Sequence, residues 1–139
     1  MQIIAALLAC ATAALAQRVA ISAPLDQAHL TAGQSTVVEI DRPDFLSSAQ
    51  EVAVVIGVQS CVTRCPAPSD TMGQVLYSGS YNPQRDPANR TKQPFQNFTV
   101  TVPSNLPKGP AQIGVAHFSL IGAGLMPFLE TTNVSVIIQ

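Results

Sequence analysis

The sequence predicts an all-β domain, an immunoglobulin-like antiparallel β-sandwich of about seven strands, with a small β-barrel as the alternative. Short apolar segments recur along the chain, separated by turns that hold most of its 11 prolines and 8 glycines. No segment of helical length keeps a helical period without a Gly, Pro or β-branched interruption. The chain contains no Trp, so the Cys–Trp–Cys pattern of true immunoglobulin domains is absent.

Alternation along the expected strands predicts which side chains face solvent. In the segment 95–102, Phe98 and Val100 share one face, whereas Asn97 and Thr99 share the other. The segment 131–138 alternates in the same way. The predicted strands are 18–23, 35–40, 51–60, 74–78, 95–102, 111–120 and 131–138.

The segment 51–60 differs from the other strands because both of its faces are apolar. This pattern predicts a central strand that is covered on both sides. Strict alternation places Val52, Val54, Ile56 and Val58 on one face, and Ala53, Val55 and Gly57 on the other.

Residues 1–16 are predicted to be a secretory signal peptide. They are almost wholly apolar, too short to span a membrane, and end in the small-x-small sequence Ala-Leu-Ala. We expect cleavage between Ala16 and Gln17, which leaves residues 17–139 as a single secreted domain. No polar spacer with an apolar tail follows the last strand, so no membrane anchor is expected.

Cleavage at this site removes Cys10 and leaves Cys61 and Cys65, which we expect to form a disulfide in an oxidising compartment. Their spacing does not match the redox Cys-x-x-Cys motif, and no neighbouring His or Cys completes a zinc site. Because the ring is small, the bond is expected to shape a loop rather than to hold the fold together.

Three N-glycosylation sequons are consistent with secretion, at Asn89, Asn97 and Asn133. Asn97 and Asn133 both fall on the polar face of a predicted strand, where a glycan has room. Asn89 lies in the long loop that precedes the segment 95–102. All three are therefore candidates for glycosylation.

The charge balance disfavours a nucleic-acid-binding protein. The chain has 7 basic and 8 acidic residues and a net charge of −1, so the basic field that such proteins need is missing. A polysaccharide-binding surface would need exposed aromatic side chains. The chain offers no Trp and only Tyr77 and Tyr81 among its tyrosines.

The sequence predicts no catalytic, metal-binding or cofactor-binding residues. His29 lies in a loop, and His117 lies in an apolar strand, where a lone histidine is usually a packing residue. Asp41 and Asp44 flank a turn and are expected to cap it rather than to form a glycosidase pair. Gln17 at the expected N-terminus excludes a copper oxygenase that begins with histidine. We therefore expect a protein that is not an enzyme and needs no cofactor.

A local cluster of basic residues lies in the long loop 82–92. Arg85, Arg90 and Lys92 occur there together, softened by Asp86. A solvated loop is the commoner explanation, and a contact patch for an acidic protein surface is the functional one.

Short phrases spread over the chain carry a family resemblance. They occupy the stretches 52–57, 74–77, 97–103, 106–111, 113–123 and 132–136. The most telling is a Pro-Lys-Gly turn at 107–109 followed by Ala-His-Phe-Ser-Leu at 116–120. Together with the signal peptide, they resemble the fungal necrosis-inducing secreted protein family over nearly the whole mature chain. The loop closed by Cys61 and Cys65 is not part of this pattern.

The resemblance implies a secreted effector without enzymatic activity. Members of this family are thought to suppress pattern-triggered immunity by binding plant receptor-like kinases and their cytoplasmic kinase partners, and they can cause host necrosis. The resemblance supplies no contact residues, and it leaves the oligomeric state and entry into the host cell open. The alternative function is a secreted cell-wall or adhesion module, which immunoglobulin-like folds often provide.

Overall fold

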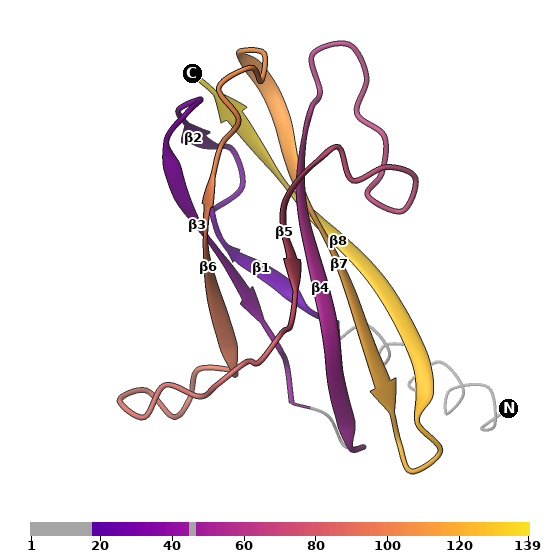
Figure 1. The fold of residues 1–139 in the computed structure, drawn as a ribbon. Helices are drawn as coiled ribbons and strands as arrows, with labels where there is room; N and C mark the ends of the chain where they lie inside the picture. Colours follow the sequence, from indigo (N-terminus) through magenta and orange to yellow (C-terminus); the bar gives the residue numbers. More distant parts are fainter. Residues whose placement is uncertain (1–17, 45–46) are drawn as a thin grey trace, which may run out of the picture.

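The computed structural model describes residues 18–44 and 47–139, which form eight strands in two sheets (Figure 1). The expected signal peptide, its cleavage site between Ala16 and Gln17, and Cys10 lie outside the described residues. The strands are β1 (Ala20–Ala23), β2 (Ala28–Leu30), β3 (Ser35–Asp41), β4 (Ala49–Ser60), β5 (Gln74–Gly79), β6 (Phe95–Thr101), β7 (Gly109–Ile121) and β8 (Met126–Ile138).

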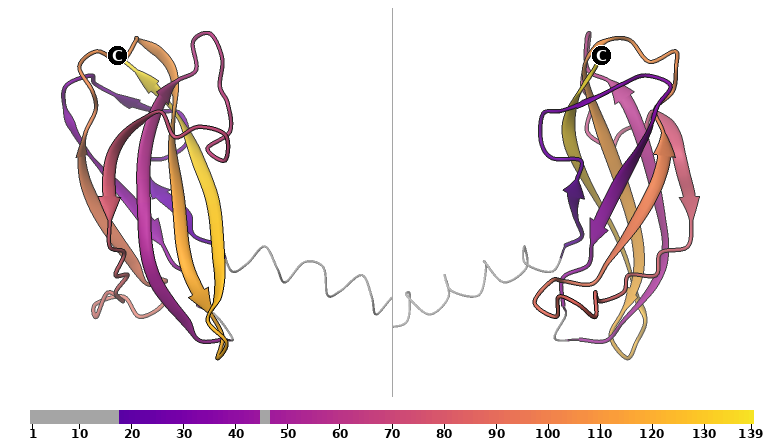
Figure 2. Two further views of the ribbon diagram at one scale, coloured as in Figure 1. Left: turned by 45° about the vertical axis from the view of Figure 1, so that its right-hand side comes forward. Right: turned by 90° about the vertical axis from the view of Figure 1, so that its left-hand side faces the viewer.

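The two sheets pack face to face as a β-sandwich (Figure 2). One sheet has the strand order β1-β3-β6, and the other has the order β2-β8-β7-β4-β5. Neighbouring strands are antiparallel except β2 and β8, which are parallel. The predicted β-sandwich is therefore confirmed, and the alternative of a small barrel is wrong.

Each predicted strand corresponds to an observed one, but β2 was not predicted. β2 spans only Ala28–Leu30 and gains its order by pairing with the distant C-terminal end of β8. β8 begins at Met126 rather than at 131, because the hairpin with β7 continues to the pair Ile121 and Met126. These differences arise from pairing between strands, which local alternation does not report.

The core lies between the sheets and consists mainly of β-branched side chains. Alternate residues of each strand reach it, as a period of two requires. Each fully buried aliphatic side chain contributes about 1.5–3 kcal/mol. The buried members on β3, β4, β6, β7 and β8 include Val38, Ile40, Val54, Ile56, Val58, Phe98, Val100, Ile113, Val115, Val136 and Ile138.

A bulge in β4 interrupts the predicted alternation at Val52. Glu51 pairs with Ser119 and Ala53 pairs with Phe118, so Val52 is the extra residue between them. Val52 is therefore 39% exposed instead of buried with Val54, which corrects the predicted face. The same bulge turns Glu51 toward the core. The prediction of a central strand is confirmed, because β4 lies between β7 and β5.

Candidate functional site

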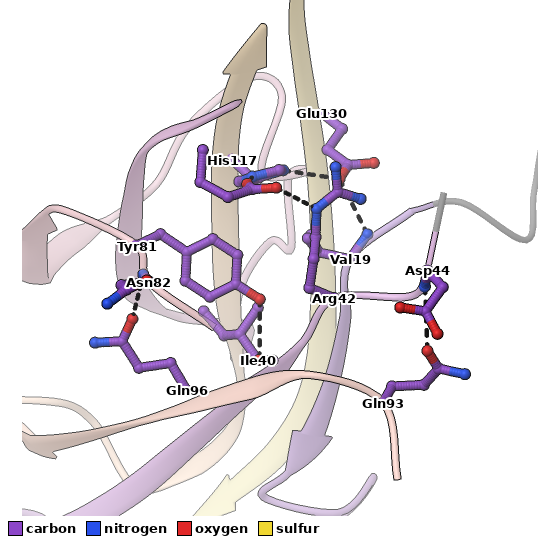
Figure 3. A network of polar contacts seen from close by, with 11 residues as sticks. Val19, Ile40, Arg42, Asp44, Tyr81, Asn82, Gln93, Gln96, His117 and Glu130 are labelled. Carbon is purple, nitrogen blue, oxygen red and sulfur yellow. Dashed lines mark hydrogen bonds and ion pairs between the residues drawn. The ribbon is translucent and has the colours of Figure 1, made fainter. Parts of the chain in front are cut away.

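A cluster of four charged residues lies inside the sandwich near one end of the core (Figure 3). His117 on β7 is fully buried, and Glu130 on β8 is 4% exposed. Arg42 follows β3 and reaches across from the smaller sheet, where its Nε lies 2.5 Å from Oε1 of Glu51. Two cations and two anions therefore meet where the two sheets face each other.

The imidazole of His117 contacts a carboxylate on each side. Its Nδ1 lies 2.9 Å from Oε1 of Glu130, and its Nε2 contacts Oε2 of Glu51. A neutral imidazole carries a single N–H, so donation to both carboxylates requires the protonated ring. Burial alone would lower the pKa of His117, but hydrogen bonds to Glu130 and Glu51 outweigh it and raise that pKa. At pH values below this raised pKa, the ring is an imidazolium that neutralises its neighbours.

Further contacts hold the cluster in place. Burial alone would raise the pKa of Glu51, but hydrogen bonds from His117 and Arg42 lower it. The backbone N–H of Val19 donates to Oε1 of Glu130 over 3.0 Å. The ring of Tyr81 meets the His117 ring edge-on, with centroids 5.3 Å apart. The cluster thus joins β4, β7 and β8 to the segment that leads into β1.

This arrangement is suited to structure rather than to catalysis. A general acid or base must reach a substrate, and the His117 side chain has no exposed surface. A cavity of about 250 Å³ lies beside the cluster, lined by Pro83, Pro94 and others, with Arg42 and Glu51 contributing to its wall. No group of three or more potential metal ligands occurs within residues 18–44 and 47–139.

The loop 61–73 between β4 and β5, which begins with the disulfide ring, folds back onto the outer face of the larger sheet. Cys61 and Cys65 are bonded, as predicted. Gly57 on β4 and Gly114 on β7 lie directly opposite each other and leave a notch beneath the loop. A Cβ at Gly57 would lie 2.1 Å from the carbonyl oxygen of Met72, so only glycine admits this approach.

Two glutamines fasten the same loop to the sheet. The side-chain amide of Gln59 donates to the carbonyls of Pro66, at 2.9 Å, and Thr71, at 3.3 Å. The amide of Gln112 donates to Pro66 as well. The loop is therefore docked by contacts that do not involve the disulfide.

Two of the three predicted basic contact residues are engaged within the chain. Arg85 lies 2.5 Å from Asp44. Lys92 lies 2.7 Å from Glu39 and 3.7 Å above the ring centroid of Phe95. Asp44, expected to cap a turn, instead pairs with the loop that contains Arg85. Arg90 is exposed. A contact patch made of Arg85, Arg90 and Lys92 stays a prediction.

The three sequon asparagines are exposed. Asn89 accepts a hydrogen bond from the Thr91 hydroxyl over 2.7 Å. Asn97 pairs with Glu39 on β3, and Asn133 donates to the side chain of Gln112 over 3.0 Å. Glycosylation of these residues stays a prediction.

Comparison with protein families decides the classification of this chain. The model of the Nis1 family matches residues 14–137. The chain belongs to this family. Nis1 proteins are necrosis-inducing secreted effectors, in agreement with the resemblance seen in the sequence. Membership of a secreted effector family and the Cys61–Cys65 disulfide both indicate an extracellular protein. The described residues contain no helix with the length and hydropathy of a membrane span.

Solved structures with similar folds include copper-dependent polysaccharide monooxygenases and a fibronectin-like module. The cellulose-active monooxygenase CelS2 has a TM-score of 0.48 and 15% identity, over 80% of this chain and 52% of that one. The monooxygenase from Streptomyces lividans has a TM-score of 0.49 and 16% identity, over 80% and 58%. Fibronectin(III)-like modules of Clostridium thermocellum CbhA have a TM-score of 0.46 and 11% identity, over 88% and 97%. This Nis1 chain thus spans about half the length of the monooxygenases. No curated protein matches it in sequence.

Proposed function

We propose that this Nis1 protein suppresses plant pattern-triggered immunity by binding host receptor-like kinases or their cytoplasmic kinase partners, without enzymatic activity. The observation that carries the proposal is the family match over residues 14–137. It covers nearly all of the domain expected after signal cleavage.

The character of the polar residues supports a binding role. The best-connected ionisable group, His117, is enclosed between Glu51 and Glu130 and cannot reach a substrate. Function would then reside on the surface, in strand edges and loops, as is usual for small β-sandwiches that recognise proteins.

A pull-down followed by direct binding tests the proposal. Purified residues 17–139 are incubated with plant extract, captured proteins are identified by mass spectrometry, and purified kinase domains are titrated with the protein. An unrelated secreted β-sandwich of similar size serves as the control. Saturable binding to a receptor-like kinase or cytoplasmic kinase, absent from the control, supports the proposal.

The alternative of a cell-wall or adhesion module has its own readout. Retention of the same protein on fungal wall glucan or chitin, together with no kinase binding, would assign it to the wall and overturn the effector proposal.

A further inference from the structure

β8 has an open edge over much of its length. It is 13 residues long, and on the side away from β7 its only partner strand among residues 18–44 and 47–139 is β2, at Val136 to Ile138. Figure 1 and the left view of Figure 2 show the yellow strand β8 along the border of the larger sheet. A strand border of this kind can accept an additional strand.

The hydrogen-bond pattern identifies the main-chain groups that face this border. In an antiparallel ladder, alternate residues direct both N–H and C=O toward the same neighbour. The carbonyl of Ser135 accepts from the N–H of Gln27 over 2.7 Å, so it faces away from β7. The β7–β8 register has no shift, so the main-chain N–H and C=O groups of Leu129, Thr131 and Asn133 also point away from β7. Within the described part of the chain, these three residues form no main-chain hydrogen bond on that side.

The side chains of Leu129, Thr131 and Asn133 lie on the outer face along this border and are uncharged, and Leu129 is the apolar one. Leu129 is 67% exposed, and it lies in one row with Phe118 and Ala53 across the outer face. Glu130 is the one charged residue of β8, and it is buried. β8 carries no exposed lysine or other exposed charge, whereas exposed charges on edge strands commonly prevent pairing with another chain. On the inner side, Arg18 has a half-exposed side chain whose Nε lies 4.0 Å from Glu130.

A second copy of β8 fits this border poorly in the three antiparallel registers centred on Leu129, Glu130 and Thr131. Centred on Glu130, two-fold pairing would set two buried carboxylates opposite each other. Centred on Thr131, it would place one Pro127 opposite Ser135, where Gln27 already lies. Centred on Leu129, it would leave the Thr131 carbonyl facing Pro127, which has no N–H.

We propose that the β8 border from Leu129 to Asn133, when Asn133 carries no glycan, is the docking site for an extended segment of a different protein, which adds to the sheet as an antiparallel or parallel strand. The fitting segment has no proline, carries apolar side chains beside Leu129, and carries a carboxylate on the opposite face, toward Arg18. The identity of the protein that supplies it rests on the proposed kinase binding, whereas the border itself does not.

A synthetic strand tests the border without any kinase. The probe alternates valine and threonine, includes one glutamate, and is N-methylated at alternate amides so that it offers a single pairing edge. Amide hydrogen exchange is followed in ¹⁵N-labelled residues 17–139. We expect protection of the Leu129, Thr131 and Asn133 amides that Thr131→Pro abolishes and Thr131→Val keeps. Unchanged exchange of these amides at saturating probe overturns the proposal.

The kinase that binds in the pull-down supplies the second test. Leu129→Lys should remove an apolar contact with the added strand, and Thr131→Pro should remove a main-chain hydrogen bond to it. Each loss should weaken binding by about tenfold or more. Val75→Lys is the matched control, since Val75 is 58% exposed on β5, the strand at the opposite border. Thermal unfolding verifies that every variant is folded.

Full affinity in both β8 variants would overturn docking at this border and leave kinase binding intact. If the unmodified protein binds no kinase, the proposed function is refuted. The peptide experiment would still show whether the β8 border accepts an added strand.

Discussion

His117 and Glu130 lie directly opposite each other on β7 and β8, with Nδ1 and Oε1 2.9 Å apart inside the sandwich. Glu51 contacts the other nitrogen of the same ring. The protein thus keeps an ion cluster where a β-sandwich usually has aliphatic side chains. A buried charge is costly when its partner is missing, so the free energy of unfolding should depend on each residue of this cluster and on pH.

Replacing His117 with alanine should destabilise the domain strongly. The substitution leaves Glu51 and Glu130 with one cation fewer in a buried setting, and breaking such a cluster costs about 3–5 kcal/mol. Urea unfolding of residues 17–139 measures the loss. His29→Ala is the control, because His29 is exposed and should change the free energy of unfolding by less than about 0.5 kcal/mol. Equal stabilities of the two variants would contradict a supporting role for the cluster.

Stability should depend on pH on both sides of a mildly acidic optimum. The pKa of His117 is raised above 6.5, so its contribution is complete below that value and is lost as pH rises through the folded-state pKa. The pKa of Glu51 is lowered below 4.5, so its contribution is complete above that value and is lost as pH falls through its folded-state pKa. The highest Tm is therefore expected between pH 4.5 and 6.5.

Thermal unfolding from acidic to alkaline pH measures this profile. His117→Gln should flatten the alkaline side, because the titrating ring is gone. An alkaline decline that persists unchanged in His117→Gln would assign the dependence to another group.

Removing the disulfide should leave the domain folded. With Cys61→Ser and Cys65→Ser together, a ring this small predicts a loss of about 2 kcal/mol, since its closure restricts few unfolded conformations. Gln59 and Gln112 still hold Pro66 against the sheet. Urea denaturation should remain cooperative in the double variant. Loss of the cooperative transition would mean that the bond holds the fold and not only the loop.

Adding a methyl group at Gly57 should displace the docked loop. The new Cβ would lie 2.1 Å from the Met72 carbonyl oxygen, so the loop must move away from β4. Gly57→Ala should cost about 1–3 kcal/mol and speed tryptic cleavage after Arg64. Gly124→Ala is the control, because nothing lies within 4 Å of a Cβ there. Equal cleavage rates in the two variants would show that the loop is not held by the glycine notch.

The strand content was predictable because alternation is a local property. In β6, Phe98 and Val100 are buried and Asn97 and Thr99 are exposed, as their order along the chain indicates. β2 was not predicted, since three residues carry too little pattern and its order comes from β8. The disulfide was predictable because Cys61 and Cys65 are the two cysteines expected to remain after signal cleavage.

The ion cluster was not predictable in the same way. His117 could be assigned to a buried strand, but nothing nearby in the sequence indicates that Glu130 and Glu51 flank its ring. Glu51 faces the core because β4 bulges at Val52, and a bulge depends on how two strands pair. The only signal available was the placement of single charged residues within apolar strands.

Short-range order along the chain was therefore enough to predict the all-β sandwich and the family to which the protein belongs, because alternation, turns and short sequence phrases are properties of neighbouring residues. Contacts between residues far apart decided the rest. The bulge turned Glu51 toward the core, and the facing glycines admitted the segment around Pro68 and Met72. Among the described residues, the short β2 left most of the β8 border unpaired. Each depends on register between strands, and register is fixed only when the sheets assemble.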